Sequence, residues 1–363
     1  MQTQDSQQRL PFRENTRQRI QRIPGALPAA FGTVQSVTLP QVGLLSRIFL
    51  FANLTISDAA VAPAVAASST ASPYNALKRI RGYTNLGTAT VFDMSGYGAY
   101  NVSKITDTCV DLKATNVDTV ADPFLQYPVA GLVQNVARGL QFVMMIPVTF
   151  NDGIQFAVGL INLQSPEIRF TLELTFGQGS DVYTTADVLT LGGAVQAYYE
   201  YYEVPDPDQV ELPDKVFHRL LEERIAFNST GDVTYLLPRM GILHQLIQIV
   251  TVNGSVDKSA TEVSGRRLVF NKTDTPYSFD YIVDRILARY RYGFPGTSQD
   301  LPGGSYVWDF ADSEQAPTRG DLRDAVDTEA LSTLEAIVTV SGIPALGANN
   351  NFIDNVRRIS QNY

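Results

Sequence analysis

Cysteine, histidine and tryptophan are almost absent from this chain, and each scarcity weakens a class of function. The single cysteine, Cys109, rules out an intramolecular disulfide framework and any zinc site built from several cysteines. The two histidines, His218 and His244, lack the spacing of a His-Glu-x-x-His metal motif. A two-histidine site stays open at this point, but we predict no bound metal and no cofactor.

Long apolar runs and net positive charge are also missing. No stretch reaches the roughly 18 consecutive apolar residues that a membrane-spanning helix needs. The N-terminus is rich in Gln and Arg without an apolar core, so we expect no signal peptide. The net charge of −9 argues against a general nucleic-acid binder, because neutralising phosphates needs clustered Lys and Arg, and we predict no sequence-specific nucleic-acid partner.

Residues suited to hydrolysis are sparse as well. We expect His218 on a charged helix, and His244 falls where the first copy of the repeat described below has Ser46. Glu222 and Glu223 are adjacent, and neighbours on a helix point about 100° apart, so they cannot face one another across a glycosidic bond. No complete nucleotide-binding glycine motif is present. We therefore predict no catalytic residues.

The chain does contain an internal repeat. Residues 39–45 read Leu-Pro-Gln-Val-Gly-Leu-Leu, and residues 237–243 read Leu-Pro-Arg-Met-Gly-Ile-Leu. Three further pairs follow in the same order: Ser72-Pro73-Tyr74 with Thr275-Pro276-Tyr277, Gly98-Ala99-Tyr100 with Gly304-Ser305-Tyr306, and the strands ending at Gly177 and Gly342. Their shared order indicates a tandem duplication of one β-rich unit, in which 39–51 and 237–249 form equivalent strands.

Several segments have the pattern of β-strands. Between Ile168 and Phe176 apolar residues alternate with Arg, Thr and Glu, which predicts a strand with one buried face. Residues 140–150 are nearly all apolar, as in a strand covered on both sides or lying at an interface. Residues 194–204 predict an aromatic strand with large rings on both faces. Its tyrosines are candidate subunit contacts: Tyr198, Tyr199, Tyr201 and Tyr202.

Three helices are expected from other patterns. In the second half, Thr275 as N-cap and Pro276 in the first turn begin a helix with an apolar stripe made of Phe279, Ile282, Val283, Ile286, Leu287 and Tyr290. In the first half, Ser72-Pro73 predicts a shorter helix that Gly82 ends. A third helix is expected after Pro213, with inward residues Val216, Phe217, Leu220, Leu221 and Ile225.

These signals divide the chain into four parts. We predict a basic N-terminal arm at 1–32, a first β-rich unit at 33–205, a second at 206–346 and a C-terminal tail at 347–363. We place the boundary near 205–213, because Val204-Pro205-Asp206-Pro207-Asp208 cannot pair as a central strand. The stretch between the last two matched pairs is longer in the first copy than in the second, so we expect inserted loops within 101–140.

The arm is basic on an otherwise acidic protein. Its local charge of +3 comes from five arginines against Asp5 and Glu14: Arg9, Arg13, Arg17, Arg19 and Arg22. The spacing of the first three would align them on one helical face. A solvated, mobile tail is one interpretation, and an arm that binds a membrane or a neighbouring subunit is the other.

Taken together, the chain resembles a known family. The tandem β-sandwich pattern, the Leu-Pro-x-x-Gly-x-Leu repeat, the basic arm and the Gly-Gly-Ser-Tyr-Val-Trp-Asp-Phe segment at 303–310 resemble the double jelly-roll major capsid proteins of tailless, icosahedral, internal-membrane bacteriophages, the tectivirus-like group. The resemblance implies an all-β fold of two tandem eight-stranded jelly-roll β-sandwiches with short flanking helices.

The resemblance also implies a function. Such a protein would form pseudo-hexagonal homotrimers, tiled into an icosahedral virion shell around an internal membrane. Its partners would be further copies of itself, penton or vertex proteins, minor capsid proteins and, on the inner face, membrane lipids. It would be made in the host cytoplasm, end in the virion capsid and catalyse nothing.

Two alternatives belong to other classes. A two-sandwich glycan-processing hydrolase would need a carboxylate cluster at the groove between its domains. A glycan-binding spike or adhesin would expose Tyr and Trp in a shallow groove. That interpretation is weaker because the chain has a single tryptophan, Trp308.

Overall fold

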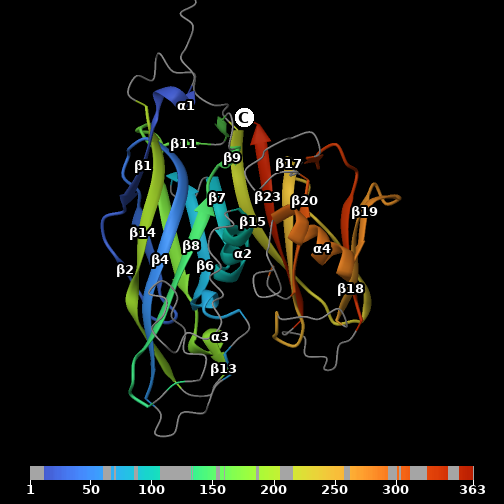
Figure 1. Ribbon diagram of the computed structural model, residues 1–363, viewed down its shortest axis with the longest axis horizontal. Helices are drawn as coiled ribbons and strands as arrows, with labels where there is room; N and C mark the ends of the chain where they lie inside the picture. The colour runs from blue at the N-terminus through green and yellow to red at the C-terminus, as the bar shows by residue number, and fades with distance from the viewer. Residues whose placement is uncertain are drawn as a thin grey trace, which may run out of the picture.

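The computed structural model describes most of the chain. The described residues are 12–59, 67–68, 71–85, 89–106, 132, 134–152, 156–158, 160–184, 188–204, 216–256, 262–292, 301, 304–310, 325–341 and 351–362. Two β-rich lobes lie side by side, one from each half of the chain (Figure 1). None of the helices in the described ranges is long and apolar enough to cross a membrane.

The first lobe is a sandwich of two antiparallel sheets. One sheet contains, in spatial order, β1 (Arg17–Arg22), β14 (Leu189–Glu203), β4 (Leu44–Asp58) and β8 (Arg138–Pro147), with β2 (Leu27–Pro28) beside β14 and β11 (Ile161–Asn162) beside β4. The other contains β3 (Val34–Thr38), β12 (Phe170–Phe176), β6 (Leu77–Thr84) and β7 (Ala89–Met94).

The second lobe repeats this arrangement. Its first sheet contains β15 (Val216–Ala226), β23 (Phe352–Asn362), β17 (Ile242–Thr251) and β20 (Ser305–Asp309), with β21 (Val326–Asp327) beside β17. Its second sheet contains β16 (Gly231–Leu236), β22 (Leu334–Val340), β18 (Val263–Phe270) and β19 (Asp274–Asp280).

Short elements complete the lobes. They are α1 (Phe12–Asn15), the 3-10 helix η1 (Tyr74–Ala76), α2 (Gly96–Thr106), α3 (Gly179–Val182) and α4 (Tyr281–Tyr292), with the two-stranded pairs β5 (Ala67–Ser68) and β13 (Tyr183–Thr184), and β9 (Phe150–Asp152) and β10 (Phe156–Val158).

The two lobes share one topology. In chain order β1, β3, β4, β6, β7, β8, β12 and β14 occupy the positions that β15, β16, β17, β18, β19, β20, β22 and β23 occupy in the second lobe. Helix α2 lies between β7 and β8, and α4 lies between β19 and β20. Eight strands in two four-stranded sheets form a jelly roll, so the predicted double jelly-roll fold is confirmed.

The repeated motif occupies the same place in both lobes. It leads into the equivalent strands β4 and β17, and its glycines Gly43 and Gly241 have left-handed φ values of 70° and 63°. The backbone N–H of Leu39 donates to Phe170 O, and that of Leu237 donates to Leu334 O, both at 2.9 Å. The expected equivalence of 39–51 with 237–249 is therefore confirmed.

The equivalence extends to a β-bulge in each strand. The ladder between β4 and β14 skips Ser46, and the ladder between β17 and β23 skips His244. In each lobe the bulged carbonyl accepts a hydrogen bond from just beyond the neighbouring strand: Val148 N–H to Ser46 O at 2.9 Å, and Phe310 N–H to His244 O at 3.0 Å. His244 thus occupies a structural position inherited from the repeat.

Two of the four matched pairs are wrong. Tyr74 precedes β6, whereas Tyr277 lies in β19. Tyr100 lies in α2, whereas Tyr306 lies in β20. The strands β12 and β22 are equivalent, as the match ending at Gly177 predicts. The short identities at the two middle pairs therefore do not mark equivalent positions of the two lobes.

The predicted helices need three corrections. Residues 77–84 form strand β6, preceded by one 3-10 turn, and residues 216–226 form strand β15. Thr275 and Pro276 lie in the edge strand β19, and the helix of that region, α4, begins at Tyr281. Apolar residues at helical spacing also fit a strand that is covered on both faces, because such a strand needs no alternation.

The predicted domain limits also change. Residues 352–362 form β23 between β15 and β17, so the C-terminal segment belongs to the second sandwich and is no tail. Arg17–Arg22 form β1 against β14, so this part of the arm belongs to the first sandwich. The boundary at 205–213 lies outside the described residues. Of the predicted loop segment 101–140, residues 101–106 belong to α2 and 138–140 to β8, and most of the rest lies outside the described residues.

Candidate assembly interface

The two lobes meet along a joint between their sheets. Strand β7 of the first lobe pairs in parallel with β15 of the second, with Leu220 opposite Phe92 and Leu221 opposite Asp93. The pairing joins one sheet of each lobe into a nine-stranded sheet from β20 to β3. Helix α2 lies at this joint, whereas α4 lies within the second lobe (Figure 1). We use the word joint below for this contact.

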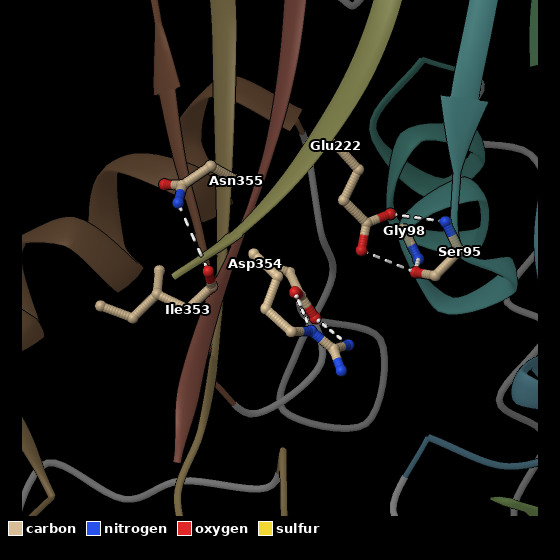
Figure 2. A network of polar contacts seen from close by, with 7 residues as sticks. Ser95, Gly98, Glu222, Ile353, Asp354 and Asn355 are labelled. Atoms are coloured by element: carbon tan, nitrogen blue, oxygen red, sulfur yellow. Dashed lines mark hydrogen bonds and ion pairs between the residues drawn. The ribbon is translucent and has the colours of Figure 1, made fainter. Parts of the chain in front are cut away.

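A carboxylate from the second lobe binds the start of α2 at the joint. Glu222 Oε2 accepts from Ser95 N–H at 2.6 Å, and Ser95 Oγ lies 2.9 Å from Glu222 Oε1 (Figure 2). Ser95 Oγ in turn accepts from Gly98 N–H at 3.0 Å. A carboxyl oxygen is a suitable acceptor at this point because the first N–H groups of a helix have no partner within it.

Close approach at this position requires glycine. A Cβ atom on Gly98 would lie 2.5 Å from Glu222 Oε2 and 3.2 Å from Val356 Cγ2. Both distances are shorter than ordinary contacts, so a larger residue would displace the Glu222 carboxylate and shift the Val356 methyl group. Gly98 therefore lets α2 lie close to Glu222 of β15 and Val356 of β23.

A second carboxylate lies beside Glu222. Asp354 accepts from Arg224 Nε at 2.7 Å and from Arg224 Nη2 at 2.9 Å. Burial, followed by the charge of Asp354, raises the pKa of Glu222 to about 7. Burial also raises the pKa of Asp354, against the opposing effect of Arg224.

The hydrolase alternative needs a carboxylate cluster between the lobes, and Glu222 with Asp354, a pair that the sequence analysis did not predict, is the arrangement to compare with it. Both oxygens of Glu222 bind Ser95, and both oxygens of Asp354 bind Arg224. Carboxylates committed in this way hold the lobes and the strands together. The prediction that Glu222 and Glu223 lie on a helix is wrong, because both lie on β15, where neighbours point to opposite faces.

Much of the rest of the joint is apolar. Leu220, Ile247, Ile249, Val307 and Val356 belong to the second lobe, yet they pack in the same cluster as the core of the first. The second lobe has a separate core that includes Leu246, Val250 and Trp308. Strands β15, β23, β17 and β20 therefore pack apolar residues on both faces, some against their own sandwich and some against the first lobe.

One end of the joint is polar and buried. Arg358 Nη2 donates to Thr149 O of the first lobe at 3.1 Å. His244 Nε2 lies 2.7 Å from Ser360 Oγ, and the rings of His218 and His244 are 5.7 Å apart. Burial and the Arg358 charge lower the pKa of His244 to about 3 and lower that of His218 well below its usual value. Both imidazoles are thus neutral at pH 7.

The histidines have the surroundings of structural residues. His218 lies on β15, so the prediction of a charged helix is wrong. No group of three or more His, Cys, Asp or Glu side chains within the described ranges could hold a metal ion. We assign both rings to packing at the joint.

The face of α4 opposite its buried side is apolar and exposed. Asp284 and Tyr292 point inward, and Asp284 accepts from Arg266 Nε at 2.5 Å and from Arg266 Nη2 at 2.6 Å. Arg266 also lies 4.0 Å from the Trp308 ring. The outward residues are 66%, 45%, 57% and 78% exposed and are called the α4 face below: Ile282, Val283, Ile286 and Tyr290.

The predicted contact tyrosines divide between two faces of β14. Tyr199 and Tyr201 are buried in the core of the first lobe, so little of either ring is open to another chain. Their hydroxyl groups lie 3.0 Å and 3.4 Å from Gln21 Oε1. Tyr198 and Tyr202 are half-buried on the opposite face, and for them the contact role stays a prediction.

The predicted arm arginines are similarly divided. Arg17, Arg19 and Arg22 are exposed on β1, and Arg19 Nε binds Glu203 Oε2 at 2.6 Å. The expected helical face of Arg9, Arg13 and Arg17 is wrong at Arg17, which lies in a strand. Arg13 lies in α1, and Arg9 lies outside the described residues.

Comparison with known proteins rests on structure alone, because the sequence matches no protein-family model and no curated protein. The chain is similar to the STIV MCP, with a TM-score of 0.66 at 15% identity over 95% of this chain and 96% of that one. It is similar to a chain of Sulfolobus Turreted Icosahedral Virus, with a TM-score of 0.63 at 16% identity over 94% and 90%. The Faustovirus major capsid protein follows with a TM-score of 0.53 at 8% identity over 95% and 90%.

The fold is the double jelly roll of these capsid proteins. The likeness spans both lobes and the joint, because nearly the whole of each chain is covered. The resemblance inferred from the repeat is thus confirmed at the level of fold.

The residues that build the double jelly-roll joint were mostly missed in the sequence. Ser95 precedes a helix whose glycines and tyrosines give no apolar stripe, so α2 was not predicted. The available signal for the start of α2 was Ser95 itself, because Ser is a preferred N-cap residue and a helix can begin directly after it. Glu222 gave no signal, because its partner lies 127 positions away.

Proposed function

We propose that this chain is a structural major capsid protein. It self-assembles as pseudo-hexagonal homotrimers, which tile into an icosahedral virion shell around an internal membrane. The observation that carries the proposal is the whole-chain double jelly-roll likeness to the STIV MCP. It acts by assembly and catalyses no reaction.

The duplicated lobe supports the trimer. Two similar jelly rolls per chain give six similar blocks in three chains, so a molecule with threefold symmetry fits a sixfold position in a shell. The exposed edge strands β1 and β19 also favour assembly, because uncovered strand edges otherwise invite aggregation.

The basic N-terminal residues support an inward-facing role. We propose that the segment before β1, with Arg9 and Arg13, lies toward anionic lipid headgroups or an acidic neighbour inside the shell. The further partners are penton or vertex proteins and minor capsid proteins. The protein is made in the host cytoplasm and ends in the virion capsid.

Light scattering on the purified protein tests the proposal. We expect a homotrimer that persists on dilution, because obligate interfaces bury a few thousand Å². A single 39.8 kDa species that stays folded on dilution would overturn the capsid proposal. Electron microscopy of the concentrated protein then shows whether trimers form hexagonal arrays.

A further inference from the structure

The intramolecular joint has a counterpart in two other sheet edges of the molecule. The joint pairs β15, an edge of one sheet of the second lobe, with β7, an edge of one sheet of the first. By topology β1 is the equivalent of β15, and β19 is the equivalent of β7. Among the described strands, β1 and β19 each end a sheet, and side chains on both are largely exposed.

The ladders fix which residues of β1 and β15 correspond. Strands β4 and β17 align through their bulges, which makes Tyr198 of β14 the equivalent of Val356 of β23. Arg22 is the ladder partner of Tyr198, and Glu222 is the ladder partner of Val356. Arg22 therefore occupies the position of Glu222.

The same argument aligns β7 with β19. The hydrogen bonds from Leu39 and Leu237 make Phe170 the equivalent of Leu334. The pairing of β12 with β6 and of β22 with β18 then aligns β6 with β18 residue by residue. Phe92 then corresponds to Tyr277. Three positions further along, Ser95 corresponds to Asp280, and each directly precedes the helix of its lobe.

The residues that the outer edges carry at these two positions are complementary in charge. At the joint, the Glu222 carboxylate binds Ser95 N–H and hydroxyl. At the outer edges the same two positions hold Arg22 and Asp280, both exposed. A guanidinium on one edge and a carboxylate on the other suit an ion pair between two chains.

The apolar residues of the joint are matched as well. Leu220, Val356, Ile247 and Ile249 are buried there, and their equivalents on the first lobe are apolar residues named here the outer face: Ile20, Tyr198, Phe49 and Phe51. Ile20 is 60% exposed and the others are half-buried. The register also places Val283 of the α4 face at the position of Gly98, which lies against Val356 at the joint.

From these correspondences we propose that each chain binds the next by repeating its own joint. Strand β19 of one copy pairs in parallel with β1 of a second copy, with Tyr277 opposite Ile20. Asp280 of the first copy binds Arg22 of the second, and the α4 face covers the outer face. This inference rests on the proposed function and specifies its subunit interface.

Such an interface is head-to-tail. Each copy contributes β19 and α4 on one side and β1 and the outer face on the other, so contacts continue around a ring until the ring closes. If the contact between chains repeats the geometry of the joint, all six lobes of a trimer are held in the same way. No two identical surfaces meet.

Cysteine cross-linking tests the strand register. Cys109→Ser provides the background, and Ile20→Cys and Tyr277→Cys are made singly and together. With both substitutions, oxidation should give covalent dimers and trimers on denaturing gels. Each single variant should stay uncross-linked, because a head-to-tail contact never brings one residue against its own copy. Cross-linked single variants, or an uncross-linked double variant in a preparation that is trimeric by light scattering, would overturn the inference.

Charge exchange tests the ion pair by a second route. Arg22→Glu or Asp280→Arg alone should raise the apparent dissociation constant of the trimer at least about tenfold, and the two together should restore it. The matched control is the exposed pair within one lobe, Arg267 and Asp232. Exchanging those charges should leave trimer stability unchanged.

The outcomes separate the two proposals. A wild-type protein that is monomeric by light scattering removes the proposed function. A trimer in which the exchanged pair fails to restore association leaves the function standing and removes this interface. Circular dichroism of every variant checks that the lobes are folded.

Discussion

Glu222 of the second lobe and Ser95 of the first lie together at the joint, with the carboxylate accepting from Ser95 N–H at 2.6 Å. The contact ties β15 to the start of α2, and it joins positions 127 residues apart. The contact between the two jelly rolls therefore depends on the Glu222 carboxyl group, whose pKa is raised.

We expect the stability of the joint to fall as the pH rises from about 4.5 to about 7. Burial and Asp354 raise the pKa of Glu222 from 4.5 to about 7, so across this range the folded protein holds a proton that the unfolded chain has lost. Differential scanning calorimetry in steps from pH 4.5 to pH 8 measures the effect. Glu222→Gln should flatten this dependence, because Gln can accept from Ser95 N–H and donate to Ser95 Oγ without titrating. A Gln variant with the wild-type slope would assign the titration to other groups.

Gly98→Ala should destabilise the joint by about 1–3 kcal/mol, as expected for overpacking. The new methyl group would meet Glu222 Oε2 at 2.5 Å and Val356 Cγ2 at 3.2 Å. Thermal unfolding of the single variant, of Glu222→Ala and of the pair measures the coupling. Removing the carboxylate should relieve part of the clash, so additive effects would contradict this account.

Tyr199→Asp and Tyr198→Asp should have opposite consequences although the residues are neighbours. Tyr199 is fully buried in the first core, so its replacement by Asp should cost at least about 3–5 kcal/mol and unfold the lobe. Tyr198 lies on the outer face, so its variant should fold and fail to form trimers. Circular dichroism and light scattering distinguish the two results. A folded, trimeric Tyr198→Asp would place the subunit contact elsewhere.

Arg266→Met should destabilise the second lobe by about 3–5 kcal/mol, because Asp284 would remain buried without its partner. Arg266 and Asp284 are only 1% and 6% exposed in their side chains. Arg267→Met is the matched control, since its pair with Asp232 is exposed and contributes about 0–1 kcal/mol. Chemical denaturation compares the two. Equal effects would mean that the buried pair does not hold α4.

Removal of residues 1–11 should leave trimers intact and impair particle assembly. A longer deletion through Arg22 should also weaken the first lobe, because it removes strand β1 from β14. Light scattering and electron microscopy of both truncations separate these effects. Normal particles from the chain without residues 1–11 would contradict the proposed role of Arg9, the arginine that this deletion removes.

The sequence by itself determined the duplication and the strands with one solvated face. Alternation from Ile168 to Phe176 predicts β12 because side chains on a strand point to opposite faces in turn. The motif at 39–45 and 237–243 predicts equivalent strands because its left-handed glycine and the bulge that follows it are properties of a local backbone path.

Only the tertiary structure decided what covers each face. Residues 216–226 include apolar residues at helical spacing, but they form a strand. Leu220 packs at the joint, and Leu221 packs on the opposite face against the core of the second lobe. On α4 the apolar stripe points outward, because the Arg266–Asp284 pair sets the buried side. Periodicity records which residues share a face, whereas the partner of that face is fixed by contacts between residues far apart in the chain.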